Sequence, residues 1–269
     1  MLKKRLIPCL ILRDGILVQS IEFKRYLGIG KPRFTIERFI DWDVDEIIFI
    51  DISATREKRG PSFELLEQIA KKCFVPLTIG GGITTIDEIK NVLKVGADKV
   101  VINTITNSNS EFISEASNKF GAQCIVVSID AKLNNGKHEV YTSCGRENTG
   151  KEVVEWAKEV ESLGAGEIFL TSIDKDGTKE GYDIKLVNKV ANAVNIPVIA
   201  CGGVGQMNDF PKGILEGNAS AVSAANIFQH SEHATIKAKS AMKLSGIDVR
   251  LITKANYLDE KKFGRLEIK

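Results

Sequence analysis

The sequence predicts a single (β/α)8 barrel, the TIM-barrel form of the α/β class. Apolar strand candidates alternate with amphipathic helix candidates eight times, with no domain linker between them. One strand–helix–strand unit recurs 121 residues later, from Pro76 to Pro197, which indicates two similar half-barrels. The chain has 269 residues, 43% of them hydrophobic, enough for one large core. An open doubly wound sheet is the alternative, and it fits the two-fold repeat less well.

The first copy of the repeat, residues 76–104, reads as strand, glycine turn, helix and strand. An apolar run ends at Ile79 and is followed by three glycines. Thr85 can cap the next helix, with Glu88 three residues later completing a capping box. Gly96 is placed to end this helix in a left-handed conformation, and a second apolar strand follows. Such a unit belongs to a parallel sheet that binds ligands at its strand C-termini.

The glycine turns of both copies predict anion binding. Gly81-Gly82 of the first copy match Gly202-Gly203 of the second. Glycines after a strand free backbone N–H groups, which can cradle a phosphate. Two copies in register therefore predict two symmetric sites for a phosphorylated small molecule, whereas the alternative is that the glycines only permit tight turns. The residues expected around the two sites are Gly82, Asn103 and Thr104, and Gly177, Gly203 and Ala225.

The other elements follow in chain order. Residues 1–250 are expected to form the barrel, and residues 251–269 a short charged C-terminal extension whose role in binding or ordering is open. Residues 13–33 are expected to be a long loop, a length typical of functional lids, and residues 133–144 a hairpin around Asn135-Gly136. The remaining strands are expected at Arg5–Leu12, Ile47–Ile52, Gln123–Ala131 and Ile168–Ser172, and helices at Thr35–Asp41, Ser62–Cys73, Ser110–Phe120, Thr149–Leu163, Tyr182–Val194 and His230–Leu244.

Composition narrows the class of function. A net charge of +2 with scattered charges argues against a nucleic-acid partner, and no apolar run reaches the length of a membrane span. The first residues superficially resemble a signal peptide, but their apolar segment is short and Arg13-Asp14 interrupt it. Five cysteines without a CxxC pair suit a reducing cytoplasm. The three histidines lack metal-ligand spacing, so we expect no metal and no cofactor.

Function in such a barrel lies at the C-terminal strand ends. The polar residues expected there include Asp51, Thr171 and Asp176 as substrate-binding residues. Asp130 ends the apolar strand IVVSID, so part of its environment is expected to be dry. Burial would raise the pKa of its carboxyl group and suit it to general acid–base catalysis. Alternatively, Asp130 only accepts hydrogen bonds from the following turn.

Four charged residues stand at strand starts, at the opposite end of the barrel. They are Arg5, Glu46, Lys99 and Glu167, two of each sign. On a common axis they could form one closed ring of ion pairs. The alternative is that these charges simply solvate the barrel floor, since isolated surface pairs contribute only about 0–1 kcal/mol.

The motifs together resemble one known family. RLIPCL, FIDISA, PLTIGGGI, GADKVVINT, VVSIDAK, YTSCGRENTG, GAGEIFLTSIDKDGTKEGYD and PVIACGGVG are similar to the cyclase subunit of imidazole glycerol phosphate synthase over about residues 1–253. The resemblance implies a barrel that takes ammonia from a glutaminase subunit, a class I glutamine amidotransferase, docked at its N-terminal face. At the opposite face, two aspartates would close a doubly phosphorylated substrate to an imidazole. Asp130 matches one of them, the four charged residues match the ammonia gate, and Asp98 and Gln123 match positions on the glutaminase side.

The departures from the family pattern cluster at the cyclase face. Ile11 stands where the family has its second catalytic aspartate, and Gln19 replaces a loop lysine. Asn226, expected in substrate binding, corresponds to a strand-eight serine, and Cys201 to a strand-seven serine. Losing a general acid or base typically lowers the rate 10²- to 10⁴-fold.

Several functions remain open on this pattern. The favoured hypothesis is a paralogue that conducts ammonia for the amidation of a bacterial surface sugar. A third protein, a sugar amidotransferase, would accept the ammonia. The alternatives are an authentic cyclase of histidine biosynthesis, in which Asp14 or Asp176 replaces the missing aspartate, a non-catalytic scaffold for the glutaminase, and a different phosphosugar isomerase.

Overall fold

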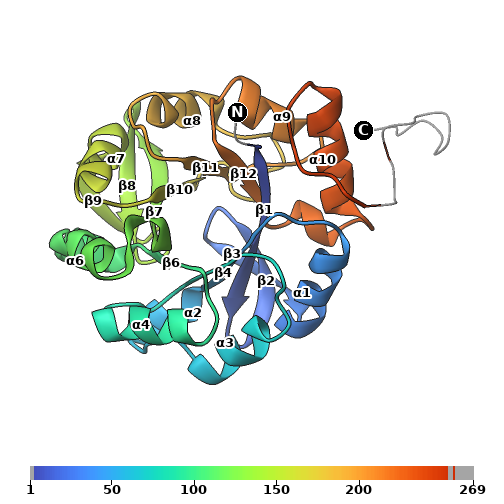
Figure 1. The fold of residues 1–269 in the computed structure, drawn as a ribbon. Helices are drawn as coiled ribbons and strands as arrows, with labels where there is room; N and C mark the ends of the chain where they lie inside the picture. The colour runs from blue at the N-terminus through green and yellow to red at the C-terminus, as the bar shows by residue number, and fades with distance from the viewer. Residues whose placement is uncertain (1–2, 254–256, 258–269) are drawn as a thin grey trace.

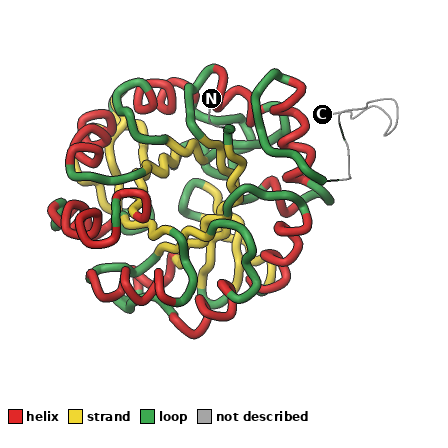
Figure 2. Tube along the Cα trace, in the orientation of Figure 1, coloured by secondary structure: helices red, strands yellow, loops and turns green. Residues whose placement is uncertain are grey.

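A computed structural model describes residues 3–253 and residue 257 of the chain. Eight parallel strands close into a barrel surrounded by helices, which confirms the predicted fold class (Figures 1 and 2). Closure is complete because β1 pairs with both β4 and β12, and β7 pairs with both β6 and β10. The barrel strands are β1 (Arg5–Arg13), β4 (Ile47–Asp51), β5 (Leu77–Gly80), β6 (Lys99–Ile102), β7 (Ile125–Asn134), β10 (Glu167–Ser172), β11 (Val198–Cys201) and β12 (Ala221–Ala224).

Helices pack around the outside of the barrel and bury its outward-facing side chains. Phe39, Phe49, Phe210 and Phe228 are fully buried in this outer core. The helices are α1 (Pro32–Asp41), α3 (Phe63–Ala70), α4 (Ile86–Lys94), α6 (Glu111–Phe120), α7 (Val153–Ser162), α8 (Ile184–Ala191), α9 (Asp209–Leu215) and α10 (Ala234–Leu244), with short helical turns at α2 (Ile52–Arg56), α5 (Thr104–Ser108), η1 (Ala122–Cys124) and η2 (Ile227–Gln229).

The two-fold repeat extends to individual hydrogen bonds. The predicted capping box is present, since Glu88 accepts from the N–H groups of Thr84 and Thr85 at 2.7 and 2.9 Å. One repeat later, Asp209 accepts from the N–H groups of Gly205 and Gln206, both at 3.0 Å. An acid at the same offset thus ties down the loop after each glycine turn. The repeat is therefore visible in the hydrogen bonds of these two loops as well as in their sequence.

The predicted loop over residues 13–33 is wrong. The segment forms a β-ribbon of β2 (Ile16–Ile21) and β3 (Arg25–Gly30), and β2 pairs antiparallel with the upper part of β1, where Ile11 lies opposite Val18. Leu17 and Val18 are buried, but the apolar run is short and is followed by polar and glycine-rich sequence. The ribbon is stabilised by pairing with β1, a long-range effect that local composition does not reveal.

A second ribbon rises from β7. The predicted hairpin around Asn135-Gly136 is confirmed by β8 (Lys137–Thr142), which pairs antiparallel with the end of β7. A further strand, β9 (Glu147–Glu152), extends it and was not predicted. Because β9 takes up residues 147–152, α7 begins at Val153 rather than at Thr149, with Glu152 accepting from the N–H groups of Val154 and Glu155.

Other helix boundaries also differ from expectation: α1 begins at Pro32 rather than at Thr35, and α3 and α8 end at Ala70 and Ala191, each three residues early. The last helix begins at Ala234 rather than at His230, because His233 is left-handed with φ of 55° and stops helical geometry there. Helix α8 begins at Ile184 because the side chain of Asp183 caps it. The expected C-terminal extension lies mostly outside the described residues.

Side chains alternate along each strand between the barrel interior and the helices. On β1, Arg5, Ile7, Cys9 and Ile11 therefore follow one another up the interior. The middle of the interior is an apolar layer separate from the outer core. Its buried members are Ile7, Cys9, Ile48, Val101, Val126, Phe169, Ile199, Cys201 and Ala221.

Within residues 3–253 and 257, no helix combines the length and the apolar character needed to cross a bilayer.

The turn after β5 should tolerate no side chain at Gly81. An added Cβ would lie 2.2 Å from the carbonyl oxygen of Asp51, and φ is 108°. We expect Gly81→Ala to lower the free energy of unfolding by about 2–4 kcal/mol, measured from urea-unfolding midpoints. Gly136→Ala is the control, because its φ is 81° but nothing lies within 4 Å of the added Cβ; it should lose only about 1 kcal/mol. Equal losses would show that close packing at Gly81 is unimportant.

Candidate functional site

A cavity of about 640 Å³ lies at the C-terminal ends of the barrel strands. Loops from both half-barrels and the β2–β3 ribbon surround it. Asp130 and every residue expected from the sequence to bind substrate line this cavity. They are Asp51, Gly82, Asn103, Thr104, Asp130, Thr171, Asp176, Gly177, Gly203, Ala225 and Asn226.

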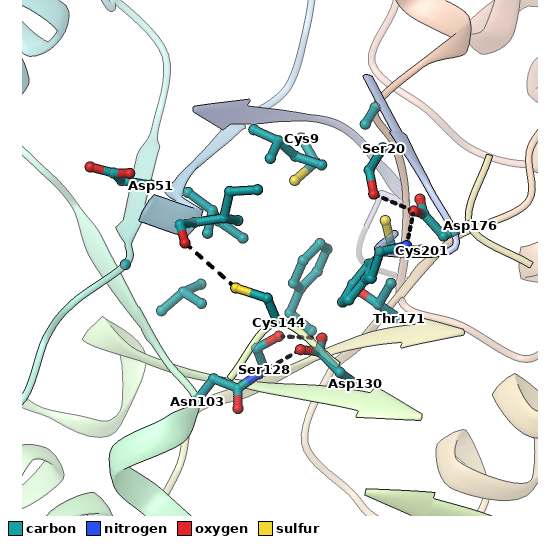
Figure 3. A pocket seen from close by; sticks show the side chains of 18 of the residues that line it. Cys9, Ser20, Asp51, Asn103, Ser128, Asp130, Cys144, Thr171, Asp176 and Cys201 are labelled. Carbon is teal, nitrogen blue, oxygen red and sulfur yellow. Dashed lines mark hydrogen bonds between the residues drawn. The ribbon is translucent and has the colours of Figure 1, made fainter. Parts of the chain in front are cut away.

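Asp130 lies at the base of this cavity and is 7% exposed. Its carboxylate accepts hydrogen bonds from Asn103 Nδ2 at 2.8 Å and from Ser128 Oγ at 3.3 Å (Figure 3). Burial raises the pKa of Asp130 to about 7; the two hydrogen bonds act against this shift, and the charge of Asp176 adds to it. A carboxyl group with this pKa can both give and take a proton near neutral pH.

Unlike Asp130, Asp51 has a structural role at the edge of the cavity. One carboxylate oxygen accepts from the N–H of Ser53 at 3.0 Å, which caps α2, and the other pairs with Arg59 at 2.8 Å. In Figure 3 its side chain lies across the cavity from Asp130. Both carboxylate oxygens of Asp51 therefore make contacts that stabilise the segments at the rim of the cavity.

Asp176 and Asn226 tie the β2–β3 ribbon to the second half-barrel. Asp176 accepts from Ser20 Oγ at 2.5 Å and from the N–H of Phe23 at 3.4 Å. The side chain of Asn226 accepts a hydrogen bond from the N–H of Ser20 at 3.3 Å and donates one to the C=O of Ser20 at 2.7 Å. Burial, the largest effect, raises the pKa of Asp176 although the hydrogen bonds from Ser20 and Phe23 oppose it. Neither of these two side chains points freely into the cavity.

Ile11 puts an apolar side chain at the cavity floor, where it packs with Ile50 against the interior layer. Gln19 does not line the cavity; its side chain contacts His230 at 3.0 Å. Asp14, one of the two candidates to replace the missing aspartate, also lies outside the cavity and pairs with Arg56 at 2.6 Å. Of those two candidates, only Asp176 reaches the cavity.

Cysteine side chains make the cavity less polar than its rim. Cys9 and Cys201 lie in the interior layer and also line the cavity, and Cys144 enters from the β8–β9 side. Burial raises the pKa of Cys201 to about 12 and that of Cys144 to about 11, so both are neutral thiols near pH 7.

The glycines of the two turns are needed for close backbone approach. A Cβ on Gly82 would lie 2.5 Å from the carbonyl oxygen of Arg59, and one on Gly203 would lie 2.1 Å from that of Gly181. Both have positive φ, 72° and 102°. Tight packing thus explains these glycines whether or not an anion binds, and it leaves the phosphate sites a proposal.

At the opposite end of the barrel, the four charged residues form a closed ring of ion pairs. Arg5 pairs with Glu46 at 2.6 Å and also with Glu167, and Lys99 pairs with Glu46 at 3.1 Å and with Glu167 at 3.0 Å. The two glutamates are 7% and 5% exposed. Burial alone would lower the pKa of Arg5, but Glu167 and Glu46 more than offset it and the pKa is raised.

An aspartate beside each of two ring residues holds neighbouring strands in register. Asp45, next to Glu46, accepts from the N–H of Leu6 at 2.8 Å, and Asp98, next to Lys99, accepts from the N–H of Leu77 at 2.8 Å. Asp45 also pairs with the fully buried Lys239 at 2.7 Å. Sequence reasoning missed the role of Asp45, although its position directly before a ring residue, like that of Asp98, is visible in the sequence.

The residues described by the structure contain no group of three or more histidine, cysteine, aspartate or glutamate side chains arranged to hold a metal ion.

Comparison with known proteins agrees with this geometry. Residues 5–235 match the family model described as "Histidine biosynthesis protein". The chain belongs to this family. A Vibrio vulnificus (strain YJ016) protein named "Putative imidazole glycerol phosphate synthase subunit hisF2" is 49% identical over 257 residues, covering 96% of this chain and 94% of that protein. The similarity to the cyclase subunit that the motifs indicate is thereby confirmed at the level of the family.

Asp98 and Gln123, which the motif resemblance assigns to the glutaminase side, lie at the floor of the barrel. Asp98 and Gln123 are both exposed. Asp98 directly precedes β6 and Gln123 lies two residues before β7, so both are on the same side of the barrel as the charged ring. The structure thus places them together with the ring, and their contact with a partner stays a prediction.

Asp130 should make stability depend on pH. Its folded-state pKa of about 7 lies above the unfolded value of about 3.9, so between these values the folded chain binds more protons than the unfolded chain. This group therefore stabilises the fold fully below about pH 4 and loses that contribution as pH rises to about 7, by about 1.4 kcal/mol per pKa unit of difference. Asp130→Asn should lack this component.

The measurement is the free energy of unfolding of both proteins from pH 5 to pH 8. The difference between wild type and Asp130→Asn should fall with rising pH and level off above about 7.5. A difference independent of pH would contradict a raised pKa.

Proposed function

We propose that the chain docks a class I glutaminase subunit at its floor and conducts the ammonia released there, while its own cyclase activity is degraded. The nitrogen would serve amidation of a bacterial surface sugar, with a separate sugar amidotransferase as acceptor in the cytoplasm. The observation that carries the proposal is an asymmetry: the charged ring is closed at one end of the barrel, while Ile11 occupies the place of a carboxylate at the other.

The floor and interior support passage of ammonia. The ring is neutral overall and links two residues of each sign on the barrel axis. Above it lies an apolar layer lined by side chains such as Val126 and Ile199. A charged ammonium ion would lose its hydration in such a layer at high cost, whereas neutral ammonia would not. Opening of the ring would thus admit the reactive form of the nitrogen.

The residues that line the upper cavity support the proposal that this chain closes the imidazole ring slowly or not at all. Besides Asp130, three carboxylates line it, and each has a structural task. Asp51 pairs with Arg59, Glu88 completes the capping box of α4, and Asp176 holds the β2–β3 ribbon. None is free to act as the second acid or base that the family mechanism needs.

The glycine turns support retention of an anionic ligand. Gly82 and Gly203 occupy equivalent positions on opposite sides of the cavity, and the polar residues Asn103 and Thr104 lie next to the first. A phosphorylated small molecule bound at both turns would span the cavity above Asp130. A ligand held there could receive or sense the ammonia.

An authentic cyclase of histidine biosynthesis is the second candidate. It is favoured by Asp130, whose pKa of about 7 suits proton transfer, and by the presence of Asp176 in the same cavity. For this function, Asp176 would have to release Ser20 and Phe23 when substrate binds.

The two candidates differ in turnover with ammonium salt and the open-chain, doubly phosphorylated substrate of the cyclase family. We expect the purified wild-type chain to form imidazole glycerol phosphate at least 10²-fold more slowly than an Ile11→Asp/Gln19→Lys variant, because the variant regains a second proton-transferring group. Ile11→Asn/Gln19→Lys, polar but unable to transfer a proton, is the control and should stay slow. Wild-type turnover equal to that of the Ile11→Asp/Gln19→Lys variant would favour the authentic cyclase.

The role of the ring can be measured in the same reactivated background. In complex with a glutaminase subunit, adding Arg5→Ala should reduce glutamine-supported turnover at least several-fold relative to ammonium-supported turnover, because ammonia would no longer be confined to the barrel axis. Lys3→Ala is the control, since Lys3 is an exposed cation paired with Asp248 outside the ring. If Arg5→Ala leaves the ratio unchanged, the chain is a scaffold rather than a conduit.

A further inference from the structure

Two lysines line the upper cavity without a carboxylate partner. Lys58 and Lys179 are both exposed, and among the described residues neither has an ion pair. The third cation lining the cavity, Arg59, is by contrast neutralised by Asp51 and Glu57. With Gln19 in place of a loop lysine, these two are the cavity's unpaired cations in the described part of the chain.

The two lysines are related by the internal repeat. Lys58 and Lys179 are 121 residues apart, the same offset that relates Gly82 to Gly203. Each is followed two residues later by a glycine, in KRG and KEG. Each half-barrel therefore brings one lysine to the cavity, in the segment that follows its second barrel strand, β4 for Lys58 and β10 for Lys179.

The backbone of both lysines is left-handed, with φ of 52° for Lys58 and 64° for Lys179. This conformation is uncommon for a residue with a long side chain, and glycine or asparagine would adopt it with less strain. The same conformation therefore recurs at the equivalent lysine of each half-barrel. Non-glycine residues held in strained conformations cluster at ligand-binding sites.

Each lysine segment packs directly against the glycine turn of its own half-barrel. On one side, the carbonyl oxygen of Arg59 lies 2.5 Å from where a Cβ of Gly82 would be. On the other, the carbonyl oxygen of Lys179 lies 2.2 Å from where a Cβ of Gly205 would be, and the N–H of Gly181 bonds the C=O of Gly203 at 2.8 Å. Lysine and glycine turn thus form one unit on each side of the cavity.

We propose that Lys58 and Lys179 are anion-binding residues, each supplying the cation that completes the anion site at its neighbouring glycine turn. The turn provides backbone N–H donors, and the ammonium on its flexible four-carbon stem provides charge. An ammonium–phosphate hydrogen bond is about twice as strong as a neutral one. This assignment rests on the proposed phosphate sites and adds to them a symmetric pair of cations.

The experiment is a ³¹P NMR titration of the full chain with inorganic phosphate. The wild type should bind two phosphates. Lys58→Gly and Lys179→Gly should each weaken one site about tenfold or more, and the double variant should weaken both. Lys90→Ala and Lys189→Ala, exposed lysines on helices α4 and α8 that do not line the cavity, are matched controls and should bind as the wild type does.

Glycine is the informative substitution because it separates folding from binding. Glycine suits a positive φ, so Lys58→Gly and Lys179→Gly should melt at or above the wild-type temperature while binding phosphate less tightly. Wild-type affinity in both variants would overturn the proposal, as would equal weakening in the Lys90 and Lys189 controls. If the wild type binds no phosphate at all, both this inference and the phosphate sites fail, whereas ammonia conduction stands or falls on the assays with glutamine and ammonium.

Discussion

Because eight parallel strands close into a barrel, every second side chain of each strand points into one shared interior. This alternation decides which residues meet at each level of the barrel. Along β1, the inward positions are Arg5, Ile7, Cys9 and Ile11. They belong in turn to the charged ring, the apolar layer and the floor of the upper cavity. The two ends of the barrel are therefore chemically distinct but connected through a continuous interior, and a substitution at one inward position acts on a defined level of that interior.

The charged ring and the upper cavity differ in how their buried carboxylates are compensated. In the ring, each buried glutamate meets two cations, so the cost of burying charge is offset within the ring. In the cavity, Asp130 has no cationic partner among the residues that the structure describes, and burial raises its pKa to about 7. Ile11 adds no second titrating group beside it. The proposed passage of a small neutral molecule rests on the first arrangement, and the proposed loss of cyclase activity rests on the second.

Much of this could be predicted from the sequence because the signals were local. The glycine turns, the capping box at Thr85 and Glu88, and charged residues directly before apolar strands all appear within short windows. The 121-residue repeat then indicated a closed barrel, in which strand starts converge. The position of Asp130 at the end of its strand was enough to predict its burial.

What escaped prediction depends on contacts between distant segments. The β2–β3 ribbon exists because β2 pairs with β1, and Asp176 and Asn226 hold it from more than 150 residues away. These contacts also leave Asp176 without the freedom that its sequence position suggests. Lys58 and Lys179 were missed for another reason: exposed lysines in polar loops are common, and only their left-handed backbone and shared cavity distinguish them.

The most direct test of the central claim is the stoichiometry of the wild-type complex with a glutaminase subunit, supplied with glutamine and the cyclase-family substrate. Glutamate and imidazole glycerol phosphate would be quantified in the same reaction. The account predicts that glutamate accumulates while cyclised product stays at least 10²-fold lower, because one of the two proton-transferring groups is absent. Formation of the two products in a one-to-one ratio would contradict it.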